Sequence, residues 1–483
     1  MTRTGADYLA AIRDDRTVYL DGEPVADVAG HPAFAPIAAT VAQLYDVAAD
    51  PASGMAHTDP VTGIGTLRPF SAPRSAADLA AFHDAARTWA RHTHGWVGRS
   101  PDHVGAFVAG FGAHPEAFDT ADHALGDSVR ALHARVQRDQ PYVAYAIIPP
   151  QVTRATTAHA WGSELVQVGV VAEKGDGIVV RGAQMLATGA AVADEVLVSC
   201  IKPLTPDDRD VAVSFVLPVA TPGLALHCRR PYAPAATSGY DYPLTTRYDE
   251  TDAFVVCDDV FVPWERVLVC RDVDGVRRQF FETGAHQLGN FQAQTRFAVK
   301  LRFLAGLARK IAQVNGIDRI PSVAERLGEL AALCAGVESG VLAALHTAAP
   351  DAAGVFLPGA RALYGSMGLQ AETYPRVLGI VRELAGGGVL QVPSGVADLR
   401  SPLTRPALDR YVFSPGTPAE ERIKLFKLVW DAVGSEFGSR HHQYEMFYAG
   451  APFVAKGYAM RHFDYDGAVA EVEEFLAGYS ATD

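Results

Sequence analysis

The stretch from about residue 141 to residue 270 constrains the fold most, because short β-branched runs follow one another there with no helical segment between them. The runs include YVAYAII (142–148), DEVLVSCI (194–201) and AFVVCDDVFVP (253–263), and glycine, proline and aspartate separate them. A Lys-Gly-Asp-Gly hairpin turn (174–177) joins two further runs. Strands without crossover helices favour a barrel or sandwich over a parallel sheet.

Helical periodicity dominates on both sides of this stretch. Residues 1–140 are mainly helical, apart from the hairpin-like piece VYLDGEPV (18–25) around an Asp-Gly turn. Beyond residue 271, long amphipathic segments predict a helical bundle. They span residues 296–316, 323–348, 360–385 and 419–438. The sequence therefore predicts an α+β chain of three domains, 1–140, 141–270 and 271–483.

Composition excludes several classes of protein. The formal net charge of −13 argues against a nucleic-acid partner, because phosphate contacts need clustered lysine and arginine. No apolar run approaches the about 20 residues of a membrane span, and the N-terminal stretch MTRTGADYLAAIRDDR has no apolar core of a secretory leader. The five cysteines form no C-x-x-C pair, which is typical of a reduced, cytoplasmic protein.

Common catalytic and nucleotide-binding motifs are missing from the sequence. It contains no P-loop, no G-x-G-x-x-G between a strand and a helix, and no G-x-S-x-G elbow. H-E-x-x-H is also absent, and the histidines lack the spacing of metal ligands, so we expect no metal site. Composition and spacing alone indicate a large α+β enzyme without its own nicotinamide-binding unit.

Three long motifs carry a resemblance to a known family. GWVGRSPDH (95–103), DYPLTTRYDETDAFVVCDDVFVPWERVL (241–268) and KLVWDAVGSEFGSRHHQYE (427–445) closely resemble the 4-hydroxyphenylacetate 3-monooxygenase family. The resemblance extends over nearly the whole chain. It implies the acyl-CoA dehydrogenase fold, in which an N-terminal helical domain precedes a central β-barrel and a C-terminal four-helix bundle that usually assembles a homotetramer.

The resemblance also implies a reaction. In this family a separate NAD(P)H:flavin reductase supplies FADH2 to the oxygenase component, which hydroxylates a phenol ortho to its hydroxyl group with O2. Bound FADH2 and O2 form a C4a-hydroperoxyflavin, and the protein contributes orientation, exclusion of water and proton transfer. The lack of a nicotinamide-binding motif fits this division between two proteins.

Arg99 is the first candidate catalytic residue. Ser100 fits the N-cap and Pro101 the first position of a helix, so Arg99 precedes a helix end that favours negative charge. An ordinary capped helix with a solvated arginine would show the same spacing. The resemblance places Arg99 and Ser100 in the substrate pocket.

His103 and Tyr145 depart from the family pattern in complementary ways. His103 lies four residues after Arg99, so both could face one cavity, and a histidine there could take the phenol proton. The family carries tyrosine at position 103 and histidine at position 145. We therefore expect His103 and Tyr145 to form a catalytic and substrate-binding pair with exchanged roles, and the exchange leaves the phenol's identity open.

The resemblance assigns flavin contacts to three segments. Besides Tyr145, Ala146 and Ile147, the predicted cofactor-binding residues are Gln151, Val152, Thr153 and Arg154 in one loop, Thr188 after a strand, and Gly450, Ala451, Pro452, Phe453 and Val454 in a C-terminal turn. Pro149 replaces the usual asparagine of the first loop and removes an amide donor.

Further substrate contacts are predicted in two places. The resemblance places Ser199, Cys200, Ile201 and Lys202 in a loop beside the substrate, and it places His286 and Asn290 where related chlorophenol and nitrophenol monooxygenases have a substrate histidine. Arg440, in the third motif, could pair with an acid across a subunit interface.

Three other functions share this fold or this pattern. A lyase similar to 4-hydroxybutyryl-CoA dehydratase would need cysteines clustered around an iron–sulfur centre, and none of the five lies within 12 residues of another. An acyl-CoA dehydrogenase would need a catalytic carboxylate over a CoA thioester. A non-catalytic flavin-fold binding protein would not need Arg99, Thr188 or the loop from Gln151 to Arg154.

Overall fold

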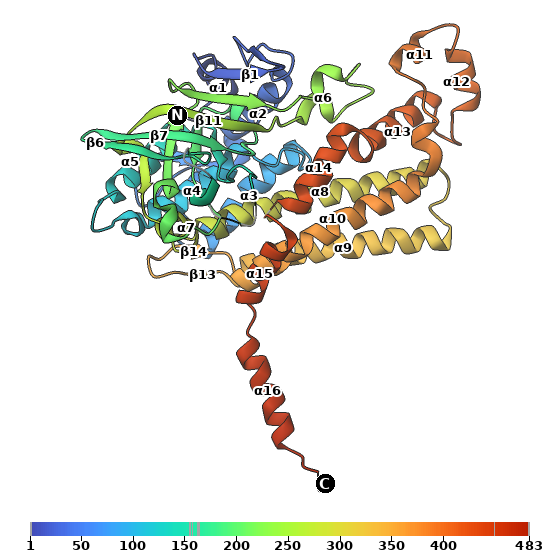
Figure 1. Ribbon diagram of the computed structural model, residues 1–483. Coiled ribbons are helices and arrows are strands. Elements are labelled where there is room, and N and C mark those ends of the chain that lie inside the picture. The colour runs from blue at the N-terminus through green and yellow to red at the C-terminus, as the bar shows by residue number, and fades with distance from the viewer. Residues whose placement is uncertain (1, 154–155, 157, 162–164, 449, 482–483) are drawn as a thin grey trace.

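A computed structural model describes residues 2–153, 156, 158–161, 165–448 and 450–481 of the chain. Figure 1 shows an α+β body in which helices and strands of the first 270 residues form one side and the long C-terminal helices form the other. The helices before residue 140 are α1 (Gly5–Ala11), α2 (Ala35–Ala49), α3 (Ala76–His92), α4 (Pro101–Ala113) and α5 (Gly126–Asp139).

The strands form two main sheets. The six-stranded sheet has the order β2-β1-β10-β11-β7-β6, and the four-stranded sheet has the order β12-β9-β8-β5. Their bounds are β1 Thr17–Leu20, β2 Glu23–Pro24, β5 Val143–Ala146, β6 Gly169–Lys174, β7 Gly177–Gln184, β8 Glu195–Val198, β9 Val213–Pro218, β10 Leu224–Cys228, β11 Ala253–Pro263 and β12 Val267–Cys270. Two-stranded ribbons complete the set, with β3 (Ala56–Thr58) beside β4 (Gly65–Leu67), and β13 (Ala349–Pro350) beside β14 (Phe356–Leu357).

The predicted central β-domain, a barrel or sandwich, is confirmed as two sheets, and in the described part of the chain no strand pairing closes them into one barrel. The predicted hairpins are present: Lys174 pairs with Gly177, and Tyr19 pairs with Pro24. The N-terminal hairpin joins the larger sheet through β1, which runs parallel to β10. The domain boundary near residue 140 stays a prediction, since β1 and β2 lie in the sheet of the next segment.

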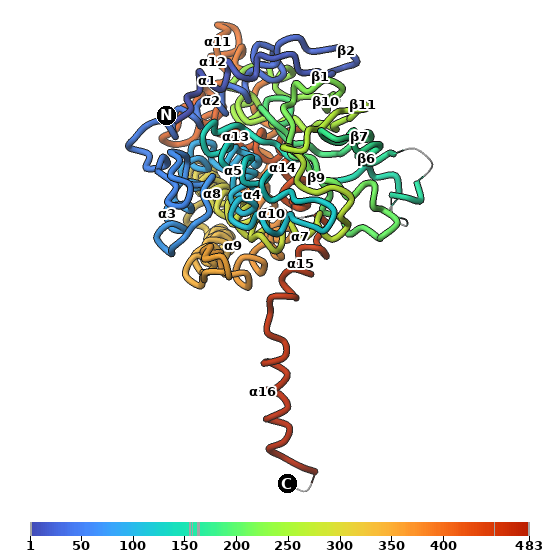
Figure 2. The backbone as a smooth tube through the Cα atoms, turned by 90° about the vertical axis from the view of Figure 1, so that its left-hand side faces the viewer, coloured from blue at the N-terminus to red at the C-terminus, as the bar shows by residue number. Residues whose placement is uncertain are grey.

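The C-terminal helices pack into the predicted bundle. Its long members are α8 (Ala285–Val314), α9 (Pro321–His346) and α10 (Ala360–Ala385), and α13 (Ala419–Val433) with α14 (Glu436–Phe447) packs along α10. The shorter helices are α6 (Thr245–Tyr248), α7 (Gly275–Phe281), α11 (Val396–Arg400), α12 (Arg405–Tyr411) and α15 (Pro452–Arg461). Both views show α16 (Tyr465–Ala477) extending away from the body (Figures 1 and 2).

Helix α9 is long and apolar enough by length and composition to cross a membrane, and 22% of its most apolar window is buried. It packs against α8 and α10 along one side, while side chains such as Leu342 remain exposed on the other. Helix α8, which packs against α9 and α10 and also against α3 and α4, is largely buried. It carries polar side chains into the interior, and some of these reach the candidate site.

Candidate active site

The candidate site begins where α4 begins. As predicted, Ser100 occupies the N-cap and Pro101 the first helical position. The Ser100 hydroxyl does not cap the helix, however; it donates a hydrogen bond to Asp102 Oδ1, 2.5 Å away. Arg99, Ser100 and Asp102 are all buried. The predicted helix start is therefore confirmed, but the arginine before it is an interior residue.

Aromatic rings surround the Arg99 side chain, which is 8% exposed. Its guanidinium carbon lies 4.9 Å from the ring centre of Tyr145, 5.4 Å from that of Tyr444 and 4.5 Å from that of Tyr448. Rings at these distances attract a cation through their quadrupoles. Among the described residues, no carboxylate forms an ion pair with this guanidinium. The site therefore contains a buried positive charge whose side-chain partners are neutral.

His103 is the direct polar partner of Arg99. Arg99 Nη1 lies 2.6 Å from His103 Nε2, and a guanidinium can only donate, so Nε2 accepts this hydrogen bond. The proton of the neutral ring is then on Nδ1, which donates to Gln292 Oε1 at 3.2 Å. Tyr145, on β5, brings its ring centre within 5.5 Å of the His103 ring. The structure thus places the exchanged pair side by side.

Burial sets the protonation of this group. Burial and the Arg99 charge hold the pKa of His103 well below its ordinary value, so the imidazole is neutral. Burial raises the pKa of Asp102 to about 6, although Ser100 and Gln292 donate hydrogen bonds that oppose this rise. Gln292 Nε2 lies 3.1 Å from Asp102 Oδ1. Gln292 therefore connects the histidine to the carboxyl group at the start of α4.

Two contacts fix the backbone beneath Arg99. Glu250 accepts hydrogen bonds from the Gly98 and Arg99 amides at 2.8 and 2.7 Å, and the Tyr142 hydroxyl donates to the Arg99 carbonyl at 2.7 Å. Gly98 is needed here, because a Cβ atom would lie 2.3 Å from Tyr444 Oη. These contacts hold the arginine against the aromatic rings.

Thr188 belongs to the same network. Its hydroxyl donates to Asp252 Oδ1 at 2.7 Å, and Asp252 also binds Arg440 Nη2 at 2.6 Å. Arg440 Nη1 lies 3.5 Å from Glu250, which holds the Arg99 backbone. The expectation of a partner for Arg440 across a subunit interface is therefore wrong: Arg440 pairs with two acids of its own chain and connects Thr188 to Arg99.

The other predicted flavin contacts vary in exposure. Ala146 and Ile147 are buried beside Tyr145, whereas Gln151 is exposed and Val152 is 54% exposed. Thr153 is half-buried, and Arg154 lies outside the described residues. Gly450 has φ of 88°, as the predicted turn requires, and Ala451 and Pro452 begin α15. Phe453 is 77% exposed, while Val454 packs against Tyr364 and Tyr458.

The predicted substrate loop, residues 199–202, directly follows β8. Ser199 and Cys200 are fully buried, and the Ser199 hydroxyl accepts a hydrogen bond from Gln279 at 2.8 Å. Burial raises the pKa of the Cys200 thiol to about 11. Ile201 is half-buried, and Lys202 lies over the Trp161 ring at 5.4 Å. The Ser199 and Ile201 amides donate to the Ala146 and Ile147 carbonyls beside Tyr145, at 3.1 and 3.3 Å. The substrate role of the loop stays a prediction.

His286 and Asn290 form a second group on α8. His286 Nδ1 lies 2.9 Å from the Tyr364 hydroxyl, and Phe281 and Tyr458 pack against its ring. Burial lowers the pKa of His286 to about 3. The Asn290 amide donates to the His286 carbonyl at 2.7 Å, which is a contact within the helix. This group meets the turn at residues 450–454 through Val454, which packs against the cluster that contains Tyr364 and Tyr458.

Sequence reasoning missed several members of the Arg99 group: Gln292, Tyr444, Tyr448, Glu250, Asp252 and the inward role of Arg440. A signal was present, because residues 440, 444 and 448 are four apart and lie along one side of α14 and its C-cap. Gln292, Arg296 and Lys300 repeat at the same spacing on the buried helix α8. Polar residues at this period in a buried helix indicate an interior site.

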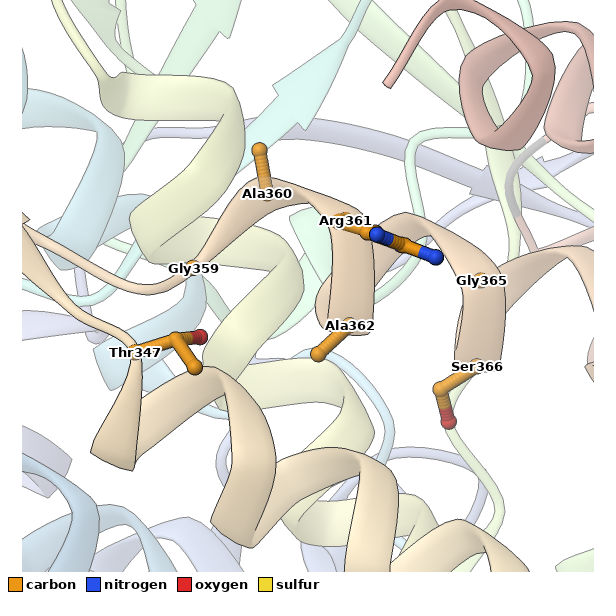
Figure 3. Close-up of a pocket in the computed structure, with 7 residues that line it drawn as sticks. All are labelled: Thr347, Gly359, Ala360, Arg361, Ala362, Gly365 and Ser366. Atoms are coloured by element: carbon orange, nitrogen blue, oxygen red, sulfur yellow. The ribbon is translucent and has the colours of Figure 1, made fainter. Parts of the chain in front are cut away.

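Two other features do not resemble a reaction centre. A hollow of about 580 Å³ between the end of α9 and the start of α10 is lined by small residues and Arg361 (Figure 3). His123, Glu173 and Cys270 bring potential metal-ligand atoms within 4.8 Å of one another. Arg271 already pairs with Glu173, and burial raises the pKa of Cys270 to about 12. A cation at this cluster would have to compete with the Arg271 guanidinium for the Glu173 carboxylate.

Comparison with known families covers the chain almost completely. The family described as "4-hydroxyphenylacetate 3-hydroxylase N terminal" matches residues 4–269, and its C-terminal counterpart matches residues 276–477. The oxygenase component of 4-hydroxyphenylacetate 3-monooxygenase from Pseudomonas aeruginosa is 38% identical over 99% of this chain and 93% of its own length.

Other relatives act on different phenols. A Streptomyces globisporus monooxygenase named for a 3-amino-3-(3-chloro-4-hydroxyphenyl)propanoyl group on a peptidyl-carrier protein is 39% identical over 92% of this chain and 85% of its own.

The crystal structure of a 4-hydroxyphenylacetate 3-monooxygenase oxygenase component with FAD and 4-hydroxyphenylacetate superposes with a TM-score of 0.93 at 31% identity, and covers 99% of this chain and 98% of its own. An archaeal 4-hydroxybutyryl-CoA dehydratase shares the fold, with a TM-score of 0.90 at 20% identity over 99% of this chain and 96% of its own.

Proposed function

The chain belongs to the 4-hydroxyphenylacetate 3-hydroxylase family and is an FAD-dependent aromatic monooxygenase, and we propose that its substrate is a phenol whose oxygen binds Arg99 as an anion. Hydroxylation occurs ortho to the existing hydroxyl group. Arg99, His103 and Tyr145 contact the substrate in this proposal, and Gln292 and Glu250 hold the first two in position.

The buried charge of Arg99 carries the proposal. Burying an ion without a counter-ion costs several kcal/mol, and Arg99 has only a neutral imidazole and tyrosine rings beside it. A phenolate oxygen would supply the missing negative charge and accept from two guanidinium N–H groups. The same charge lowers the pKa of the bound phenol, which makes the ring carbon ortho to its oxygen more electron-rich.

His103 receives the phenol proton in this arrangement, because the phenolate that forms offsets the Arg99 charge, and before the phenol binds it is burial and this charge that lower the pKa of the imidazole. In the ligand-free geometry its Nε2 lone pair accepts from Arg99. When the guanidinium turns an N–H group toward a phenol oxygen, that lone pair becomes available at the same place. Gln292 keeps the Nδ1 proton in position meanwhile, so the imidazole can accept at Nε2 without changing tautomer.

The residues around Thr188 fit a flavin. The Thr188 hydroxyl donates a hydrogen bond to Asp252, so its lone pairs can accept from another donor. Val152 and Phe453 are exposed apolar side chains, which are suited to cover a flat ring. When bound in reduced form, FAD would supply the two electrons that activate O2 for transfer of one of its oxygen atoms. Thr188, the loop at Gln151–Thr153 and the turn at residues 450–454 would hold it, while Arg99 orients the phenol.

A direct test pairs the purified protein with a flavin reductase and NADH. The phenols should include a free 4-hydroxyphenyl acid, a tyrosine-derived acid, a coumarate, a halophenol, and a 4-hydroxyphenylacyl group on a carrier protein, because the relatives divide among such substrates. We expect a catechol from at least one of them, with little H2O2. Consumption of O2 with H2O2 as the sole product from every phenol would overturn the proposal.

The CoA-thioester alternatives are not favoured. The lyase would require cysteines gathered around an iron–sulfur cluster, and the His123 group contains a single cysteine. The likeness to the dehydratase at 20% identity shows the fold alone. The intact Arg99 group and Thr188 network also argue against a non-catalytic binding protein and a dehydrogenase.

We further propose a homotetramer in the cytoplasm that receives reduced FAD from a separate reductase. Helix α9 and α16 support the oligomer: Leu342 on α9 is 50% exposed, and Val469, Val472 and Leu476 form an exposed stripe on α16. A second copy would cover these side chains, and the hollow beside Ala362 would take a helix of the partner. Light scattering should give about 206 kDa, four times 51.5 kDa, and Leu342→Asp should shift the species to lower mass.

A further inference from the structure

Asp102 is a buried carboxyl group beside the residues that contact the phenol. It is the second residue of α4, and its side chain has no exposed surface. The Ser100 hydroxyl and the Gln292 amide donate to Oδ1 over 2.5 and 3.1 Å, and the backbone amides of Asp102 and His103 also donate to the carboxyl group. Oδ2 is buried and has no hydrogen-bond partner among the described residues. The donors therefore favour the carboxylate, whereas burial favours the protonated acid.

Gln292 connects this carboxyl group to His103 with a fixed direction. Arg99 donates to His103 Nε2, so the proton of the imidazole is on Nδ1 and the Gln292 oxygen accepts it at 3.2 Å. The amide nitrogen of Gln292 then donates to Asp102. The positive end of the amide dipole thus faces the carboxyl group, and its negative end faces the imidazole. A carboxylate on one side and an imidazolium on the other therefore stabilise each other across the amide.

The other titratable groups near this pair keep a constant charge around neutral pH. They are Arg99 before α4, Tyr45 on α2, His133 on α5, Tyr145 on β5, Arg296 on α8 and Tyr448 after α14. The two arginines are permanent cations. Burial raises the pKa of each tyrosine and lowers that of His133, so these groups stay neutral. A positive charge that forms on His103 is therefore the change to which Asp102 responds.

We propose that Asp102 is a positioning residue that supplies the counter-charge of His103, so that a bound phenol can pass its proton to the imidazole. The O–H bond of the phenol breaks, and an N–H bond forms at His103 Nε2. The imidazolium then holds Asp102 as a carboxylate, and a proton that Asp102 carried before binding is released to solvent. The phenolate pairs with Arg99, and the imidazolium pairs with the carboxylate through the amide. The inference rests on the proposed function, in which Arg99 binds the phenolate.

The test counts the protons released when a phenol binds to the protein saturated with reduced FAD, without O2. Isothermal titration calorimetry in buffers of different ionisation enthalpy gives this number. The probe is 4-hydroxyphenylacetate or, where that acid is not hydroxylated, the phenol of the panel that yields most catechol. Because the pKa of Asp102 is about 6, the wild type should release up to about half a proton per phenol at pH 6 and none at pH 8. Its affinity should rise with pH to about 6 and stay level above.

Two variants change this behaviour in different ways. Asp102→Asn has no proton to release, so we expect no release at pH 6. It should bind the phenol about 10-fold more weakly than the wild type at pH 8, because the imidazolium lacks its counter-charge, and approach the wild type below pH 5. Ser100→Ala removes a donor that favours the carboxylate, so the rise in affinity should move to higher pH. This second variant tests the inference where Asp102→Asn does not fold.

A matched control is available at the start of α3. Ser75 donates to Asp78 Oδ2 at 2.8 Å there, so Asp78→Asn makes the same change away from the site and should keep the wild-type proton release. Circular dichroism checks that each variant is folded. Equal release in the wild type and Asp102→Asn, or equal pH profiles in the wild type and Ser100→Ala, would overturn the inference. No release from a wild type that hydroxylates phenols would overturn it and leave the function standing, whereas a protein that hydroxylates no phenol would overturn both.

Discussion

Arg99 donates a hydrogen bond from Nη1 to His103 Nε2 over 2.6 Å, inside a buried group of aromatic rings. The bond joins a permanent cation to a base that burial keeps neutral. Neutral histidine orients the guanidinium but does not offset its charge, unlike a carboxylate. The pair therefore retains the ability to bind an anion, and the arginine and histidine can contribute different steps to the same reaction.

Replacement of Arg99 by alanine tests the anion-binding role. Arg99→Ala should lower the rate of phenol hydroxylation about 100-fold, because it removes the positive charge and its N–H donors. Oxygen consumption should continue and yield H2O2, and the mass of the assembly should not change. Chromatographic product analysis with a parallel H2O2 assay measures the effect. Arg99→Lys keeps the charge but not the planar set of N–H donors, so its hydroxylation rate should lie between those of the wild type and Arg99→Ala. A near-normal product yield from Arg99→Ala would refute the anion-binding role.

Gln292 should matter through His103. Gln292→Met removes the acceptor of the Nδ1 proton, so the imidazole can adopt the other tautomer, and we expect about a 10-fold loss of hydroxylation. Gln292→Glu should raise the pKa of His103, and the resulting imidazolium would repel Arg99. The pH at which substrate affinity changes should therefore be higher in Gln292→Glu than in the wild type, and it should not rise in Gln292→Met.

A neighbouring glutamine on the same helix provides the control. Gln294 binds Gln370 instead of the histidine, so Gln294→Met should leave the pH profile as in the wild type. Nitrogen NMR of labelled histidine reports the tautomer directly. Identical tautomers in Gln292→Met and the wild type would exclude this positioning role.

The order of helices and strands could be predicted from local patterns, and the sheet closure could not. The Asp21-Gly22 turn and the Ser100-Pro101 helix start depend on neighbouring residues, and both are present. The parallel pairing of β1 with β10 joins residues 17–19 to residues 225–227. Such long-range pairing leaves no trace in local periodicity, so the strand runs could not distinguish a barrel from a sandwich of two sheets.

The site was predictable in part for the same reason. Arg99 and His103 are one helical turn apart, so their spacing indicated a shared cavity. Tyr145 was assigned from the family resemblance, and the structure brings its ring beside His103. Gln292 and Glu250 approach them from more than 150 residues away. Arg440 was assigned to a subunit interface because its motif was interpreted as an assembly determinant, whereas two acids of its own chain enclose it.

Gly98 should tolerate no side chain. In Gly98→Ala the new Cβ would lie 2.3 Å from Tyr444 Oη, and the ring would have to leave its place beside Arg99. Overpacking of this kind costs about 1–3 kcal/mol in the free energy of unfolding, and substrate affinity should fall with it. Gly306→Ala on α8, where no atom lies within 4 Å, should instead stabilise by about 0.5–1 kcal/mol. Urea unfolding of both variants measures the contrast, and equal stabilities would contradict it.

Glu445 should make the protein sensitive to acid. It is buried between Arg296 and Lys300, with Lys300 Nζ 2.9 Å from Oε1. Burial alone would raise the pKa of Glu445, but these two cations lower it to about 2 from 4.5. Because the folded-state pKa is depressed, this contribution to stability is complete above about pH 4.5 and is lost as the pH falls toward 2. It amounts to roughly 3 kcal/mol.

The comparison variant is Glu445→Gln, which has no proton to gain. Its free energy of unfolding should be lower than that of the wild type at pH 7, because two buried cations lose their counter-charge. The difference should narrow as the pH falls from about 4.5 toward 2, because the unfolded wild type takes up a proton at Glu445 at higher pH than the folded protein does. Urea titrations at intervals of half a pH unit follow both curves. A constant difference across this range would show that the pKa of Glu445 is the same in the folded and unfolded protein, so that the two cations do not depress it.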